Sequence, residues 1–156
     1  MTDISIFLEA IQSGDANRVE TLIKAHPNLV NTKDQRGFTP LIFATYFDKK
    51  GIVEVLLKHK AYVDATDASG NTALIGVAFK GNKEIANLLI KNGAYVNAKN
   101  NQGVTPLIFA TMYNKVDMVT FLLKQNADKT IKDGQGKTAL DYANEKGLKA
   151  MVGVLQ

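Results

Sequence analysis

The sequence repeats a short phrase with a constant period of 33 residues. Residues 37–45 (GFTPLIFAT) and 103–111 (GVTPLIFAT) differ at one position, and two weaker copies keep the same register. The four copies begin, with no insertion or deletion between them, at Gly37, Gly70, Gly103 and Gly136. A period of this length indicates a stack of small supersecondary units, because a single unit is too small to bury its apolar face alone.

Each unit is predicted to open with a turn. Polar residues surround the repeated glycine, and such clusters provide positive φ angles and local side-chain hydrogen bonds. A residue with a carboxylate or amide stands three positions before every glycine, at Asp34, Asp67, Asn100 and Asp133. Successive members of this column belong to different units, one repeat apart. We therefore expect them to stabilise their own turns rather than to share a proton or a calcium ion.

Two helices are predicted to follow each turn. A threonine stands where a helix N-cap belongs, and in two units a proline follows it at the first helical position, where a missing N–H is harmless. The first helix is short, with Leu41, Ala44 and Thr45 on one face. It is expected to end at residues that tolerate a left-handed conformation, namely Asp48, Gly81, Asn114 and Gly147. The second helix is amphipathic and covers residues 52–57, 85–90 and 118–123.

The repeat register extends over the whole chain. Residues 1–36 are predicted to form a divergent N-terminal capping repeat, with Thr2 or Asp3 capping its first helix and Asp15 its second. Internal repeats are expected at 37–69, 70–102 and 103–135, and a truncated C-terminal capping repeat at 136–156. We expect one elongated domain over residues 1–156, with atypical ends because each terminal unit turns one face to water.

The period and the Thr-Pro-Leu opening make the chain similar to the ankyrin repeat family. The resemblance covers nearly the whole sequence, in about four and a half repeats. It implies an all-α solenoid of stacked helix–turn–helix units with β-hairpin-like loops, acting as a binding platform for another protein. The sequence departs from the family signature at its histidine, which is replaced by Ile42, Ile75, Ile108 and Asp141. We expect the three isoleucines to substitute apolar packing for the hydrogen bonds of that histidine.

Catalytic and metal-binding patterns are not found. The chain has no cysteine, and we find no nucleophile elbow, no phosphate-binding glycine loop and no zinc-protease helix. The two histidines, His26 and His59, are one period apart and occupy equivalent helix ends, where the helix dipole and free carbonyls explain them. Neighbouring helices are about 8–10 Å apart, too far for both imidazoles to ligate one metal. We expect a protein that is not an enzyme and that needs no cofactor.

Composition restricts the partners. The net charge is +4, but all the basic residues except Arg18 and Arg36 are lysines, whereas arginine usually makes bidentate phosphate and base contacts. We therefore do not expect a nucleic-acid partner. No apolar run reaches the roughly 18 residues of a membrane span. The N-terminus lacks the basic and apolar regions of a signal peptide, so we expect the cytoplasm, or the periplasm or secretion if a signal peptide has been removed.

A binding surface is predicted on the first helices and the turns. The pairs after the small residues of the first helix read Tyr46-Phe47, Phe79-Lys80, Met112-Tyr113 and Glu145-Lys146. The resemblance implies that they face a concave groove, and exposed aromatic groups often anchor partners. Residues flanking the turn glycines would extend the surface: Gln35, Arg36, Phe38, Ala68, Ser69, Asn71, Asn101, Gln102 and Val104. The alternative is that one residue of each pair fills space between helices while the other is a scattered surface group.

Two further tyrosines, Tyr62 and Tyr95, stand where the family commonly has an acidic residue. We expect them to pack against the fold, with a second binding patch as the alternative. The most direct functional interpretation is a monomeric, non-catalytic adaptor or regulator that binds another protein. An exported, host-directed protein and an engineered or consensus-derived scaffold without a natural partner remain as alternatives, although the irregular repeats argue against a strict consensus.

Overall fold

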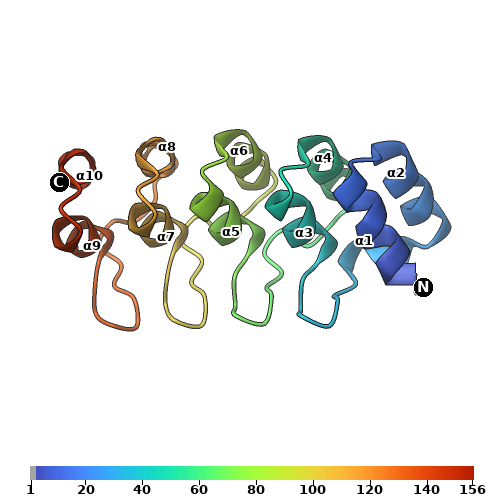
Figure 1. The fold of residues 1–156 in the computed structure, drawn as a ribbon, viewed down its shortest axis with the longest axis horizontal. Helices are drawn as coiled ribbons and strands as arrows, with labels where there is room; N and C mark the ends of the chain where they lie inside the picture. The colour runs from blue at the N-terminus through green and yellow to red at the C-terminus, as the bar shows by residue number, and fades with distance from the viewer. Residues whose placement is uncertain (1–2) are drawn as a thin grey trace.

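The computed structural model describes residues 3–156 as two parallel rows of helices (Figure 1). Each unit contributes one helix to each row, and the loops between units all project on the side of the first row. The first row contains α1 (Asp3–Ser13), α3 (Pro40–Tyr46), α5 (Ala73–Lys80), α7 (Pro106–Met112) and α9 (Ala139–Glu145). The second row contains α2 (Ala16–Ala25), α4 (Lys50–Lys58), α6 (Lys83–Lys91), α8 (Val116–Lys124) and α10 (Lys149–Leu155). A 3₁₀ helix, η1 (Pro27–Asn31), follows α2.

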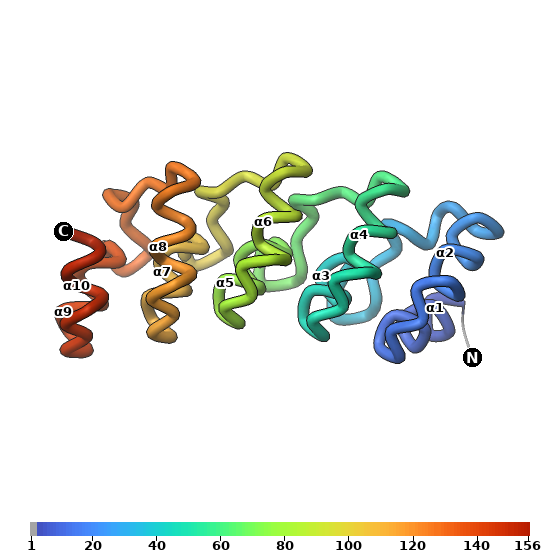
Figure 2. Tube along the Cα trace, turned by 90° about the horizontal axis from the view of Figure 1, so that it is seen from above, coloured from blue at the N-terminus to red at the C-terminus, as the bar shows by residue number. Residues whose placement is uncertain are grey.

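The units stand side by side in the order of the sequence, with the termini at opposite ends of the row (Figure 2). Each helix packs against its partner in the same unit, and successive helices of the first row pack against one another along the whole stack. The expected all-α solenoid is therefore confirmed.

Threonine caps start the first helices after the turns, as predicted. The hydroxyl oxygen of Thr39 accepts the N–H of Ile42 at 3.1 Å, and Thr72 and Thr105 bind Ile75 and Ile108 in the same way. All three isoleucine side chains are buried, so their backbone N–H groups are satisfied while their side chains pack. In the last unit the N–H of Thr138 also donates to the Asp141 carboxylate, which completes a capping box.

Left-handed residues end the helices. The first helices of the later units are followed by Asp48, Gly81, Asn114 and Gly147, and all four have positive φ angles. Lys60 has a φ of 67° at the end of α4, a position that glycine or asparagine fills in the next two units. Asp15 caps α2 through the N–H of Arg18 at 3.0 Å. Asp3 is itself the first helical residue of α1, and Thr2 lies outside the described residues.

The turns are built by the column of Asp34, Asp67, Asn100 and Asp133. In each, one side-chain oxygen accepts the N–H groups two and four residues later, at 2.9–3.1 Å. The carbonyl of Phe38 also accepts the N–H of Asp34, a hairpin-like pairing that recurs in every later loop. At Gly37 two separate features require glycine. Gly37 has a φ of 82°, and a Cβ there would lie 2.9 Å from the backbone nitrogen of Ala68 in the next loop.

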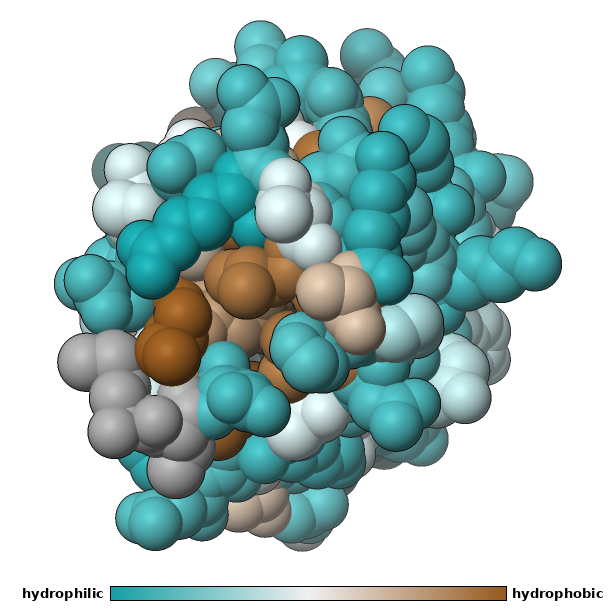
Figure 3. Space-filling view, turned by 90° about the vertical axis from the view of Figure 1, so that its right-hand side faces the viewer, coloured by the Kyte–Doolittle hydropathy of each residue, from teal (hydrophilic) through white to brown (hydrophobic). Residues whose placement is uncertain are grey.

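A continuous apolar core runs between the two rows. Small residues such as Ala44, Ala110 and Ala143 are fully buried where neighbouring first helices meet. In α6, Leu89 is fully buried and Leu88 is only half-buried. The N-terminal end of the stack shows an apolar area framed by hydrophilic side chains (Figure 3), as expected for a unit with one face turned to water.

Candidate functional site

A groove of about 430 Å³ lies between the first-row helices and the loops. Its floor and walls come from α3, α5 and α7, and its rim from two successive turns. The residues that line it are Arg36, Phe38, Ile42, Phe43, Thr45, Tyr46, Phe47, Asp67, Asn71, Thr72, Gly76, Phe79 and Phe109. The lining is mainly apolar and aromatic, with most of its polar groups on the turn side, which is the usual composition of a binding groove.

One aromatic cluster lies on α3 at the N-terminal side of the groove. The ring of Phe47 packs on Phe43 with centroids 4.8 Å apart and meets the ring of Tyr46 edge-on at 5.1 Å. Tyr46 is 61% exposed, whereas Phe47 and Phe43 are half-buried. This cluster therefore presents one large aromatic face to solvent, held in place by two partly buried rings.

A second cluster joins α5 and α7 at the opposite side. Phe79 meets Tyr113 edge-on at 4.5 Å and Phe109 at 5.8 Å, and Phe109 and Tyr113 are 5.3 Å apart. Phe79 and Tyr113 are 37% and 48% exposed. Contacts of this kind favour a fixed geometry of the rings, so the surface is preformed.

Gly76 lies between the two clusters. It is the equivalent, one period away, of Phe43 on one side and Phe109 on the other. Its backbone does not have the positive φ that favours glycine, and nothing lies within 4 Å of the position that a Cβ would take. The groove is therefore open at Gly76, where the middle unit has no side chain.

In three units, each predicted pair on the first helix has one exposed and one half-buried residue. Tyr46, Phe79 and Tyr113 are exposed, while Phe47, Lys80 and Met112 are half-buried. The ammonium of Lys80 already has partners within the chain, because it pairs with Asp48 at 2.9 Å and also donates to the carbonyl of Tyr46. Each pair thus combines a space-filling residue, as in the alternative interpretation, with an exposed one. The exposed ring of each pair takes part in the clusters rather than being scattered.

The turn residues of the predicted surface are not equally available. Gln35, Arg36, Ala68, Ser69, Asn101 and Gln102 are exposed, and Phe38 and Asn71 are half-buried. Val104 is only 6% exposed and belongs to the apolar core, so its predicted place on the surface is wrong. The reason is that its N–H is fixed on Asn100 at 3.0 Å, and its branched apolar side chain packs against the core.

Several of these turn residues also connect neighbouring repeats. The backbone N–H of Asn101 donates to the carbonyl of Ser69 at 3.0 Å, and its side-chain amide donates to Ala68 at 3.1 Å. Arg36 pairs with Asp34 at 2.9 Å and lies over the ring of Phe38. Burial raises the pKa of Asp34, but hydrogen bonds from the Phe38 and Arg36 N–H groups and the guanidinium outweigh it and lower that pKa.

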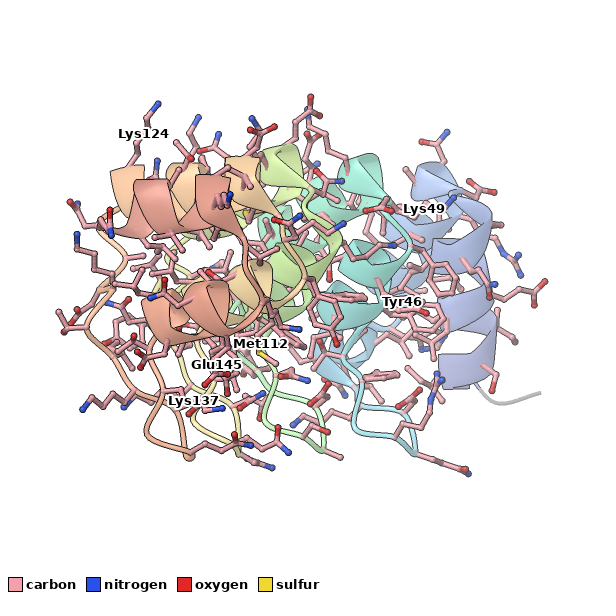
Figure 4. The ribbon with its side chains drawn as sticks, turned by 60° about the vertical axis from the view of Figure 1, so that its left-hand side comes forward. Tyr46, Lys49, Met112, Lys124, Lys137 and Glu145 are labelled. Atoms are coloured by element: carbon pink, nitrogen blue, oxygen red, sulfur yellow. The ribbon has the colours of Figure 1, made fainter. Side chains whose placement is uncertain are left out.

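The last unit carries polar groups at the positions that follow the aromatic clusters in the stack. Lys137 and Glu145 form an ion pair at 3.0 Å beside α9, on the same side of the stack as Met112, while Lys124 points outward at the opposite edge (Figure 4). Tyr142 occupies the position equivalent to Gly76, and its hydroxyl donates to Asp133. That hydrogen bond is the main reason that the pKa of Tyr142 is raised to about 12.

Sequence reasoning missed Phe43, Gly76, Phe109 and Asp67. A signal existed, because Phe43 precedes Phe47, and Phe109 precedes Tyr113, by four residues, which places each pair on one face of a helix. It also missed Glu20, whose carboxylate on α2 pairs with His59 and Lys58 at 3.0 Å. The hydrogen bond from His59, followed by that from Lys58, lowers the pKa of Glu20 to about 2.

The predicted packing of Tyr62 and Tyr95 is wrong. Their side chains are 68% and 60% exposed. Their backbones are held, since the N–H of Tyr62 donates to Asn31 at 2.8 Å and that of Tyr95 to Asp64 at about 3.1 Å.

Within residues 3–156, no three His, Asp or Glu side chains gather in a way that would hold a metal ion. The same part of the chain contains no helix with the length and apolar character of a membrane span.

A family model built from known proteins matches most of the chain. The family model for ankyrin repeats (three copies) matches residues 7–100 and again residues 77–156. No curated protein matches the sequence.

Proposed function

The chain belongs to the ankyrin repeat family, whose repeats generally mediate protein binding and are typically non-catalytic, and we propose that it binds a partner protein in the groove over α3, α5 and α7. The observation that carries this proposal is the exposure of Tyr46, Phe79 and Tyr113 around an apolar hollow. Clusters of exposed aromatic side chains are unusual on a surface that contacts only water and are typical of binding hot spots.

The surface is rigid before the partner arrives. Its rings contact one another, Lys80 ties the end of α3 to α5, and hydrogen bonds of Asn101 tie successive turns together. Among the described residues, no buried side-chain nitrogen or oxygen lacks a hydrogen-bond partner. A preformed surface loses little conformational entropy on association, which favours affinity. The protein would act as an adaptor or regulator, as a monomer that covers part of its partner.

The test is affinity capture from the organism that encodes the chain, followed by mass spectrometry. The triple variant Tyr46→Ala, Phe79→Ala and Tyr113→Ala should lose the captured protein while keeping a cooperative thermal transition. The matched control is Tyr62→Ala with Tyr95→Ala, which removes two exposed tyrosines that do not line the groove. This control should capture the same protein as the unmodified chain.

Two outcomes would overturn the proposal. Unfolding of the triple variant would show that the rings belong to the structural core. Equal capture by the triple variant and the unmodified chain would show that the partner binds elsewhere. Capture of no protein under varied conditions would instead favour a scaffold without a natural partner.

A further inference from the structure

The glycine in the middle of α5 has no structural explanation. Apart from proline, glycine is the poorest helix former, and a helix interior normally excludes it unless a neighbour approaches closely. At Gly76 there is no close neighbour, because nothing lies within 4 Å of an added Cβ, and the backbone needs no glycine. The equivalent residues in the flanking units are Phe43 and Phe109. What the glycine does provide is an open space between two aromatic clusters.

The last unit shows which side chain fits such a space. There the equivalent residue is Tyr142, which is 8% exposed and whose hydroxyl donates to the Oδ2 atom of Asp133. Asp133 is positioned for this contact by its other oxygen, Oδ1, which accepts the N–H groups of Gln135 and Lys137 at 2.9 and 3.1 Å. The fold thus contains a built example of a phenol seated between a first helix and its turn.

The middle unit repeats this arrangement except for the phenol. Asp67 is held as Asp133 is, since its Oδ1 accepts the N–H groups of Ser69 and Asn71, both at 2.9 Å. Asp67 also lines the groove. Its Oδ2 atom receives no hydrogen bond or ion pair from any residue in the range 3–156.

The other members of the turn column are already engaged at the corresponding atom. Asp34 pairs through Oδ2 with Arg36, and Asn100 donates through Nδ2 to Asn71. The available carboxylate oxygen and the missing side chain therefore occur in the same unit.

We propose that the hollow over Gly76 receives the side chain of a tyrosine from the partner protein. Its ring would lie against Phe43, Phe79 and Phe109, and its hydroxyl would donate to Oδ2 of Asp67. A phenylalanine would leave this carboxylate oxygen without a partner, and the covering of an unpaired carboxylate is unfavourable. The inference rests on the proposed function, because it names the residue that the partner places in the groove.

The test uses two small probes that differ only in the hydroxyl, N-acetyl-tyrosine amide and N-acetyl-phenylalanine amide. Each is titrated into the full-length, isotope-labelled chain, and the amide resonances of Gly76 and its neighbours are followed by NMR. We expect both probes to shift these resonances. The tyrosine probe should bind about tenfold more tightly, since a hydrogen bond to a charged group raises the affinity by at least that factor.

Three variants make the assignment specific. Asp67→Asn should reduce the preference for the tyrosine probe to about twofold while the turn persists, because Asn100 already builds the same turn. Gly76→Phe, which copies the flanking units, should abolish binding of both probes. The control Gly51→Phe places the same side chain on a helix glycine in α4 that is exposed and also has nothing within 4 Å. It should leave probe binding unchanged.

The outcomes separate this inference from the function on which it rests. Equal affinity for the two probes, or shifts that map away from Gly76, would overturn the tyrosine assignment. The proposed function would stand even then, provided that the variant without Tyr46, Phe79 and Tyr113 no longer captures the partner protein. A concentration-dependent shift of Gly76 in the absence of probes would assign the hollow to a tyrosine of a second copy, and would likewise overturn the proposal of a different partner protein.

Discussion

Replacing Tyr142 with phenylalanine tests a hydrogen bond through which the side chain of a first helix holds the turn of its own unit. The substitution removes only the hydroxyl that donates to Asp133, and both residues are 8% exposed. The ring itself stays, as does its contact with the ammonium of Lys137, which lies 5.3 Å from the ring centroid. The change in stability therefore reports the phenol–carboxylate contact and little else.

The expected loss is about 1.5–2 kcal/mol. A hydrogen bond to a charged group contributes about 1.5–3 kcal/mol. The lower part of this range applies because Asp133 keeps two backbone N–H donors, from Gln135 and Lys137. With a urea dependence of about 1–3 kcal/mol per molar, the midpoint of unfolding should fall by roughly 1 M.

The pH dependence gives a second, independent readout. The pKa of Tyr142 is raised to about 12 in the folded chain from an ordinary value of 10.0. A raised pKa in the folded state means that the contribution is fully present below pH 10 and is lost as the pH rises through 12. The advantage of the unmodified chain over Tyr142→Phe should thus be constant from neutral pH to about pH 10 and then disappear.

In acid the shift has the opposite sign, because the pKa of Asp133, which accepts the hydrogen bond from Tyr142, is lowered in the folded chain. Burial raises the pKa of Asp133, but hydrogen bonds from Tyr142, Lys137 and Gln135 outweigh burial and lower that pKa below 3.8. This contribution is present above pH 3.8 and is lost as the pH falls through the lowered pKa. Urea titrations monitored by circular dichroism at a series of pH values would measure both the alkaline loss from Tyr142 and the acid loss from Asp133. Equal midpoints at neutral pH, or a difference that persists unchanged at pH 12, would refute the reasoning.

Three further predictions follow from the core, the groove and the second row. Leu89→Ala should cost about 2–5 kcal/mol and clearly more than Leu88→Ala, because only Leu89 is fully buried; equal urea midpoints would contradict the inward face of α6. Gly76→Ala should raise the free energy of unfolding by about 0.5–1 kcal/mol, since alanine favours a helix and meets no neighbour, and a lower melting temperature would disprove this. In His59→Ala, the pKa of Glu20 should rise from about 2 toward 4.5, as followed by carboxyl NMR; an unchanged pKa would exclude His59 as the main cause. Because the pKa of Glu20 is lowered in the folded chain, its contribution to stability is present above pH 4.5 and is lost as the pH falls toward 2, and the variant should show less of this acid-dependent loss.

Much of the architecture was readable from the sequence because it depends on residues close together along the chain. The helix caps join residues three apart, as Thr72 and Ile75 do, and the turns join residues two and four apart, as Asp67 and Asn71 do. Such contacts have sequence signatures, since the residue types at fixed short spacings determine which hydrogen bonds form. The constant period then indicated that the units stack, so the all-α solenoid followed.

The tertiary structure alone decided which surfaces remain open. Val104 carries the same turn signals as Phe38 yet is buried, and Tyr62 is exposed where packing was expected. The hollow over Gly76 exists because aromatic residues one period away project on both sides of it. Its depth is determined by the sizes of side chains 33 positions apart and by how closely successive helices pack. That distance between units is a property of the whole stack, and no single repeat of the sequence contains it.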